Sequence, residues 1–342
     1  MKILVTGCLH GEWEKLVNTV NQIEQEKGTK PDLIIVSGDT QTMRTEKDLE
    51  SLACPPQYRL MHTFYKLYTG EIQMPVPTIV VGGNHEAMDW LFLLPFGGWL
   101  APNVFYAGRA NSLVFGDTTI SSISGLYRSN FYYQPVNEKY PIRSNDMTSS
   151  HHIRAFSDFQ LLGLSNTDIM CSHDWPSGTA SNYGGKYLEK LKPTLIDSDR
   201  AGNFGLIRGM DYINKLTPSA YFAAHHHIKF STTINDCSFI ALPKPAGKNE
   251  WCCLVDFEGN PGELKYRGEW ISILKATGAE MANPELLKNV NWGEKWKEMK
   301  PKLQQYPDQP LGEYELDPIK YTADFCRRNE IFCPNETIRP YI

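Results

Sequence analysis

Three apolar runs, each ending in glycine and then a polar side chain, constrain the fold of this chain most. The runs cover residues 3–7, 33–36 and 77–81. They are rich in β-branched residues and lack polar alternation, which is typical of strands buried on both faces of a sheet. A segment with helical spacing at residues 11–27 separates the first two runs, and helical material at about 46–52 and 59–69 separates the second run from the third. The resulting βαβαβ order predicts a parallel sheet with right-handed crossovers.

The later part of the chain predicts a second set of strands. Short strands at 104–106, 112–116 and 118–124 indicate antiparallel pairing. Further strands are expected at residues 168–172, 220–224, 228–234, 237–242 and 251–256. Residues 177–204 are rich in Gly and Ser and are expected to be irregular, whereas 205–216 and the chain from about 268 read as helical.

Composition excludes several classes of protein. A formal net charge of −5 argues against a broadly basic nucleic-acid binder. It does not exclude a nucleic-acid substrate, because a local basic patch can supply positive charge. The sequence shows no apolar leader with a cleavage site and no run of membrane-spanning length, so no membrane association is expected. None of the 8 cysteines forms a CxxC pair, which argues against a zinc ribbon and favours a reducing compartment.

Polar side chains with metal-binding chemistry follow the ends of the predicted strands. These residues are Cys8, His10, Asp39, Asn84, His85, His173, His225 and His227. Each has an ordinary alternative explanation: a cysteine can be a small buried hydrophobe, an aspartate can cap a helix, and adjacent histidines can form an exposed turn. Because ligands of open α/β sheets bind at the carboxyl ends of the strands, the whole set predicts a dinuclear metal site.

The predicted chemistry follows from these residue types. Two divalent ions about 3.5–4 Å apart can position the attacking and leaving oxygens of an in-line displacement, and an anionic phosphoester is the matching substrate. Asp39 is the one carboxylate in the set, so it is expected to bridge the ions. If the segments are extended, alternate side chains share a face, which would pair Cys8 with His10 and His225 with His227, and would turn His226 away.

Several motifs carry a family resemblance. The chain resembles the calcineurin-type metallophosphoesterases in Gly38-Asp39, Gly83-Asn84-His85-Glu86, His173 and His225-His226-His227. It departs from their pattern at Cys8, where they have Asp, and at Ala224, where Gly is common. At both positions the chain resembles one branch of these enzymes, the RNA lariat debranching enzymes. Further similar motifs are Pro95-Phe96-Gly97-Gly98-Trp99, Ser124-Gly125-Leu126-Tyr127, His152-Ile153-Arg154 and Ser172-His173-Asp174-Trp175-Pro176.

The resemblance implies an α/β fold, a two-sheet metallophosphoesterase sandwich flanked by helices. It implies hydrolysis of the 2′–5′ phosphodiester at the branch point of intron lariats, with His85 as general acid; a supporting role beside Asn84 is the alternative. One implied metal pocket is Cys8, His10, Asp39 and His227, and the other is Asp39, Asn84, His173 and His225. Because a thiolate favours soft metals, Fe(II) and Zn(II) are expected, with Mn(II) as the alternative.

Residues 125–154 hold interleaved aromatic and basic side chains with no regular period, and a helix is expected at 151–163. The resemblance implies that residues 125–154 are a lariat-recognition loop; an ordinary insertion whose aromatics pack inward is the alternative. Aromatic stacking and local neutralisation of phosphates suit single-stranded RNA. The predicted RNA contacts are Tyr127, Arg128, Phe131, Tyr132, Tyr133, Arg143, His152 and Arg154.

The resemblance also implies a division of the chain. A catalytic domain is expected at residues 1–260 and a small, mostly helical debranching-enzyme domain at 261–342. Branched RNA is the expected partner, with no obligate protein partner, and the expected location is the nucleus with a cytoplasmic fraction. A phosphatase or phosphodiesterase for another substrate, and a non-catalytic scaffold on this fold, are the alternatives.

Overall fold

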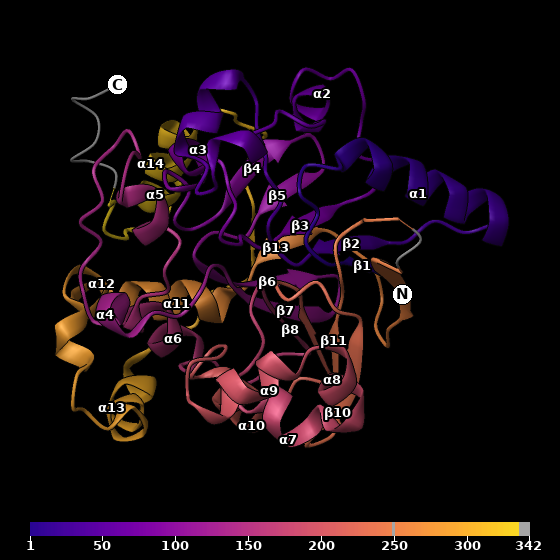
Figure 1. The fold of residues 1–342 in the computed structure, drawn as a ribbon. Coiled ribbons are helices and arrows are strands. Elements are labelled where there is room, and N and C mark those ends of the chain that lie inside the picture. Colours follow the sequence, from indigo (N-terminus) through magenta and orange to yellow (C-terminus); the bar gives the residue numbers. More distant parts are fainter. Residues whose placement is uncertain (248–249, 335–342) are drawn as a thin grey trace.

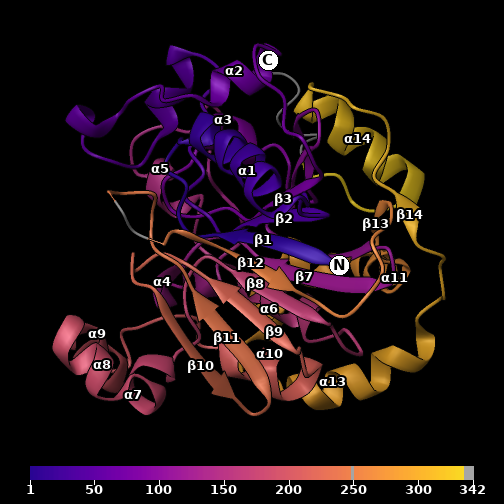
Figure 2. The ribbon, with the colours of Figure 1, turned by 90° about the vertical axis from the view of Figure 1, so that its right-hand side faces the viewer.

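The computed structural model describes residues 1–247 and 250–334. Two mixed β-sheets lie against each other, and helices flank them (Figures 1 and 2). One continuous hydrophobic core contains side chains from both sheets and from the helices that cover them. The predicted α/β architecture is therefore confirmed. Within the described residues, no helix has the length and apolar character needed to cross a membrane.

The first sheet contains the three apolar runs as adjacent parallel strands. Its strands, in spatial order, are β12 (Cys252–Asp256), β1 (Lys2–Thr6), β2 (Leu33–Val36), β3 (Thr78–Val80), β5 (Val104–Tyr106) and β4 (Gly98–Ala101). β1, β2, β3 and β5 are parallel, whereas β12 and β4 pair antiparallel at the edges. Helix α1 (Trp13–Lys27) connects β1 to β2 and ends at Gly28, whose φ of 65° lies in the left-handed region. The predicted βαβαβ order is confirmed.

The second sheet combines a parallel centre with antiparallel hairpins. Its spatial order is β10 (Phe230–Ile234), β11 (Cys237–Ala241), β9 (Ala220–Ala223), β8 (Ile169–Ser172), β7 (Thr118–Ile123), β6 (Ala110–Phe115), β13 (Leu264–Tyr266) and β14 (Gln309–Pro310). β7, β8, β9 and β11 are parallel to their neighbours in that group. The antiparallel prediction is right for β6 with β7, and β5 pairs antiparallel with β4 but parallel with β3. Two strands predicted for the second set, β5 and β12, lie in the first sheet instead.

The stretch 177–204, predicted to be irregular, is instead helical. It forms α7 (Thr179–Tyr183), α8 (Gly185–Leu191) and α9 (Pro193–Arg200), and α10 (Gly209–Leu216) follows. The carboxylate of Asp199 accepts hydrogen bonds from the backbone N–H groups of Gly178 and Ser181, both at 2.7 Å. Glycine and proline therefore divide this segment into short helices, and the Asp199 carboxylate satisfies N–H groups where α7 begins.

The segment 125–154 is mostly irregular but contains two short helices. These are α4 (Ser129–Tyr132) and α5 (Asp146–Ser149), and the helix predicted at 151–163 begins later, as α6 (Ala155–Leu161). Other short helical elements lie around the first sheet: η1 (Glu46–Ser51), η2 (Pro56–Tyr58), α2 (Phe64–Tyr68) and α3 (Met88–Leu91).

The C-terminal segment packs along both sheets. Its helical elements are α11 (Gly268–Ala276), α12 (Gly278–Ala282), η3 (Pro284–Leu287), α13 (Trp292–Met299), η4 (Lys300–Lys302) and α14 (Pro318–Asn329). The Trp296 ring stacks on Phe159 at 4.7 Å, and Phe325 stacks on Phe96 at 5.4 Å. The helical prediction is right, but β13 and β14 were not predicted. The domain boundary stays a prediction, and residues 335–342 lie outside the described part.

Candidate metal centre

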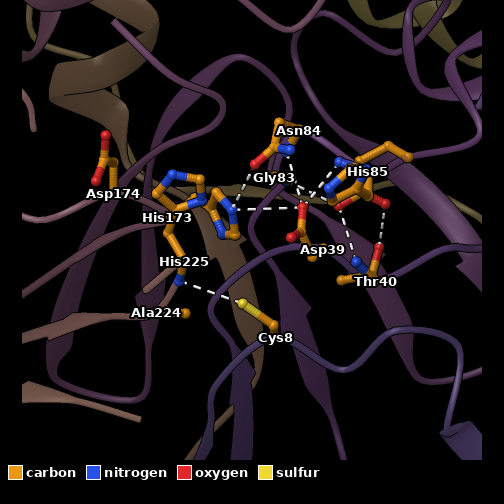
Figure 3. A network of polar contacts seen from close by, with 12 residues as sticks. Cys8, Asp39, Thr40, Gly83, Asn84, His85, His173, Asp174, Ala224 and His225 are labelled. Atoms are coloured by element: carbon orange, nitrogen blue, oxygen red, sulfur yellow. Dashed lines mark hydrogen bonds and ion pairs between the residues drawn. The ribbon is translucent and has the colours of Figure 1, made fainter. Parts of the chain in front are cut away.

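Strand ends from both sheets meet at one place and deliver the predicted polar side chains (Figure 3). Cys8 follows β1, Asp39 follows β2, and Asn84 follows β3; from the second sheet, His173 follows β8 and His225 follows β9. Parallel strands of each sheet carry their carboxyl ends to the same edge, which is why residues distant in sequence come together here.

One cluster contains a thiol, two imidazoles and a carboxylate. One ligand atom from each of Cys8, His10, Asp39 and His227 lies within 4.8 Å of the others. The Nε2 atoms of His10 and His227 are 3.0 Å apart, and the Sγ atom of Cys8 accepts a hydrogen bond from the backbone N–H of His225 at 3.2 Å. A cation between these two ring nitrogens could be bound by both of them.

The second cluster shares Asp39 with the first. Donor atoms of Asp39, His173 and His225 lie within 4.8 Å of one another. The Nδ1–H of His173 donates to the carbonyl of Ser37 at 2.9 Å, because a carbonyl can only accept, so the neutral imidazole carries its lone pair on Nε2. That Nε2 lies 3.2 Å from Oδ1 of Asn84 and 3.4 Å from Oδ1 of Asp39. Acceptor atoms that converge in this way fit a bound cation.

The charge of Asp39 outweighs burial at His173 and raises the pKa of that imidazole to about 9. Burial keeps the other three imidazoles neutral, as metal ligands must be. It lowers the pKa of His10 to about 4, that of His227 to about 4 and that of His225 to about 3. Burial, with the charge of Asp39, also raises the pKa of the fully buried Cys8 thiol well above its usual value. A thiolate at this position therefore requires a neighbouring cation, which is the condition that a bound metal supplies.

The backbone at the strand ends is strained. His10, Asp39, His225 and His227 have φ values of 47°, 47°, 59° and 55°. Non-glycine residues in the left-handed region are uncommon, and they cluster at functional sites. We predicted that extended backbone would pair Cys8 with His10 and His225 with His227. That prediction was wrong about the backbone, which is not extended at His10, His225 and His227. Left-handed turns aim these side chains instead, and His225 and His227 go to different clusters.

Glu86 connects two of the strand ends and was not predicted as a site residue. Its carboxylate accepts from the backbone N–H groups of Thr40, Gln41 and Gly83 at 2.9, 3.0 and 2.8 Å, and from the Thr40 hydroxyl at 2.7 Å. These bonds fix the chain after β2 against the chain after β3. A buried carboxylate normally needs hydrogen-bond partners of this kind. In the sequence, only the position of Glu86 directly after His85 indicated that it belongs to the site.

Asp39 is held by the same strand end. Its Oδ1 accepts hydrogen bonds from the backbone N–H groups of Asn84 and His85, both at 2.8 Å. A Cβ added at Gly83 would lie 2.3 Å from that same oxygen, so only glycine fits at this approach. The side chain of His85 is anchored separately, because its Nδ1–H donates to the carbonyl of Ala53 at 3.0 Å.

Known proteins are similar in sequence to this chain. Residues 1–229 match the family described as calcineurin-like phosphoesterase. The chain is 35% identical over 284 residues to the lariat debranching enzyme of Arabidopsis thaliana, across 80% of this chain and 68% of that relative. The chain belongs to the lariat debranching enzyme family, within the calcineurin-like phosphoesterases. It is 36% identical to debranching enzyme A of Xenopus laevis and 35% identical to the Homo sapiens enzyme, across 81% of this chain.

Coverage of these debranching enzymes is uneven. The chain spans 54% of both the Xenopus laevis and the Homo sapiens proteins, about half of their length. The matched part includes the metal centre, because the calcineurin-like phosphoesterase match runs from the first strand to residue 229, just beyond His227. Family membership therefore rests on the part of the chain that builds the site.

The predicted recognition loop divides into buried and exposed side chains. Tyr132 and His152 are buried, Arg154 is buried in an ion pair with Glu138, and Arg143 pairs with Asp89 at 2.6 Å. In contrast, Tyr127, Phe131 and Tyr133 are partly exposed and Arg128 is exposed. In this conformation the first group holds the loop to the protein, and the second group is accessible to a ligand.

Replacing Tyr132 with phenylalanine tests the anchoring of the loop. The Tyr132 hydroxyl donates to the buried carboxylate of Asp158 at 2.6 Å, and burial already raises the pKa of Asp158 to about 6. Tyr132→Phe is expected to lower the free energy of unfolding by about 1–3 kcal/mol, because it removes a donor from a buried acceptor. Chemical denaturation measures this. Tyr133→Phe is the control, and an equal loss in both variants would contradict the anchoring role.

Proposed function

We propose that this protein is a metal-dependent RNA phosphodiesterase that hydrolyses the 2′–5′ phosphodiester at the branch point of intron lariats. The observation that carries the proposal is the pair of clusters joined at Asp39, one of them containing the Cys8 thiol. The names of the similar debranching enzymes support the lariat substrate. Location in the nucleus, with a cytoplasmic fraction, belongs to the same proposal.

The two clusters suit two divalent metals. Cys8, His10, Asp39 and His227 would hold one, and Asp39, Asn84, His173 and His225 would hold the other. When bound, such ions polarise the scissile phosphate and activate water as the nucleophile. The thiolate favours Zn(II) or Fe(II) in the first pocket, and Mn(II) is the harder alternative.

His85 is the residue proposed to protonate the leaving 2′-oxygen. Because Nδ1 of His85 already donates to Ala53, the second ring nitrogen, Nε2, is the atom available for proton transfer. The His85 ring centroid lies 6.0 Å from that of His10, which places His85 beside the proposed metal ligands. A supporting role for His85 is the alternative, and its variant is discussed below.

Replacing Cys8 with serine tests the thiolate pocket. Cys8→Ser is expected to weaken zinc or ferrous iron binding in that pocket by at least about 10–100-fold, the usual cost of losing even an outer partner of a metal site. Metal analysis after anaerobic loading measures the content and the affinity. Cys333→Ser, which changes a half-buried cysteine elsewhere, is the matched control. If Cys8→Ser retains two equivalents with native affinity, Cys8 is not a ligand.

Replacing Arg128 with alanine tests the exposed part of the loop. Each phosphate contact that is lost lowers the salt dependence of binding, so Arg128→Ala is expected to weaken branched-RNA binding and to reduce the salt slope by about 1. Fluorescence anisotropy at several salt concentrations measures both. Hydrolysis of a small generic phosphodiester should be unchanged, and Arg327→Ala, on the exposed face of α14, is the control. Equal losses with both substrates would mean that the loop is structural only.

A comparison of substrates tests the function itself. Hydrolysis of a branched RNA far faster than that of p-nitrophenyl phosphate is expected for a debranching enzyme. The reverse preference would favour a phosphatase for another substrate on this fold. If the metal-loaded protein hydrolyses neither compound, the non-catalytic scaffold is the better description.

A further inference from the structure

A polar groove of about 330 Å³ runs from the metal centre to the loop. Asp174, His225 and His226 line its inner end, and Tyr127 and Arg128 line its outer end. Its far wall is the connection between α9 and α10, which none of the predicted RNA contacts includes. Its volume lies within the range of small-molecule sites.

The wall of the groove is held in place by backbone hydrogen bonds. The N–H of Leu206 donates to the carbonyl of Trp175 at 2.8 Å, and the N–H of Ser177 donates to the carbonyl of Leu206 at 3.0 Å. The ring of Phe204 is 5% exposed and stacks on His226 with centroids 4.8 Å apart and planes 18° apart. The groove is therefore formed before a ligand binds.

His226 belongs to this wall rather than to the two proposed metal pockets. Its Nε2 lies 3.1 Å from Oδ1 of Asp174, and Trp175 packs edge-on against it with ring centroids 5.4 Å apart. This explains why the middle histidine of three points away from Asp39. The inner end of the groove thus presents a carboxylate and a fixed aromatic surface beside His225.

The remaining lining groups suit a nucleotide. The polar side chains of Arg128, Ser198 and Asn203 line the groove. They can bind ribose hydroxyls and base edges, and the partly exposed Tyr127 ring offers a stacking surface. Donors, a carboxylate acceptor and an aromatic face together distinguish this groove from a purely apolar one.

We propose that this groove binds the base and ribose of the nucleotide that keeps the scissile phosphate. The assignment of that nucleotide rests on the proposed function. His85 lies on one side of Asp39, whereas His173, His225 and Asp174 lie on the other (Figure 3). A leaving 2′-oxygen beside His85 places the branch nucleoside on that side. In an in-line displacement the water enters opposite the leaving oxygen and the retained ester is equatorial, so its nucleotide leaves the metal centre in a direction different from that of the branch nucleoside. The groove that begins beside His225 offers such a direction.

Filling the rim of the groove tests the site by binding. Ile207, 41% exposed, lies on the rim, and Ile207→Trp should occlude it. The metal-loaded native protein is expected to bind adenosine 5′-monophosphate about tenfold more tightly than ribose 5-phosphate, since a stacked base adds affinity. Ile207→Trp should remove that difference and leave adenosine 2′-monophosphate binding unchanged. Leu286→Trp, 46% exposed on η3, is the control and should behave as native.

The outcomes separate this site from the proposed function. If Ile207→Trp preserves the tenfold difference, or weakens both monophosphates equally, the groove assignment is overturned. The native protein should have a KM about tenfold higher for branched RNA that lacks the base on its 5′-phosphoryl nucleotide than for the intact branched RNA. Ile207→Trp should show no such difference between the two RNAs. Suppose that the native protein cleaves no branched RNA and still prefers adenosine 5′-monophosphate to ribose 5-phosphate, with that preference lost in Ile207→Trp. In that case the debranching proposal fails and the nucleotide site stands.

Discussion

Replacing Asp39 with asparagine is expected to weaken metal binding at both proposed pockets by about 10²–10⁴-fold, the range for removing one partner of a buried charge pair. Asp39 is the one residue common to the two clusters, and it is 1% exposed. Although burial raises the pKa of a carboxyl group, His173 and the neighbouring histidines hold the pKa of Asp39 well below its usual value. Asparagine keeps the shape but supplies no charge to offset two cations.

Metal content and affinity, measured by mass spectrometry and by competition with a chromophoric chelator, check this expectation. Asp48→Asn is the matched control, because Asp48 is a buried carboxylate that pairs with Arg44 at 2.8 Å, outside both clusters. Turnover of branched RNA should fall with metal content. Retention of two equivalents in Asp39→Asn would show that this carboxylate does not bridge the two pockets.

The sequence was most informative where structure is local. Continuous β-branched runs identified β1, β2 and β3, because a strand buried on both faces needs apolar residues at every position. β13 and β14 have three residues and two residues, and their pairing depends on partners far away in the chain. Neither segment is a continuous apolar run of the kind that marked β3 and β5, so the extension of the second sheet could not be predicted.

The site shows the same division between residue type and geometry. The metal-binding role of Cys8, His10 and Asp39 could be predicted, because few sites other than metal centres place a thiol, an imidazole and a carboxylate at strand ends. The left-handed backbone that aims His10 and Asp39 was not, since neither is the glycine that usually signals positive φ. Likewise, the aromatic loop did not reveal that Tyr132 faces Asp158, 26 residues away.

Replacing His85 with alanine is expected to lower turnover by about 10²–10⁴-fold, the usual contribution of a general acid, and to leave metal content intact. The structure separates these two effects. Asp39 receives the backbone N–H of His85, which alanine retains, whereas the imidazole itself contacts the carbonyl of Ala53. The variant therefore removes the proton donor and preserves the hydrogen bond that holds Asp39.

Single-turnover hydrolysis of branched RNA, with metal analysis of the same samples, measures both quantities. His62→Ala is the control, because His62 is a half-buried histidine beside Gly11 that belongs to neither cluster. A substrate whose leaving 2′-oxygen is replaced by sulfur needs little protonation to depart. His85→Ala should therefore recover most of its rate on that substrate if the imidazole is the acid. An equal deficit on both substrates would instead assign His85 to positioning Asn84 and the phosphate.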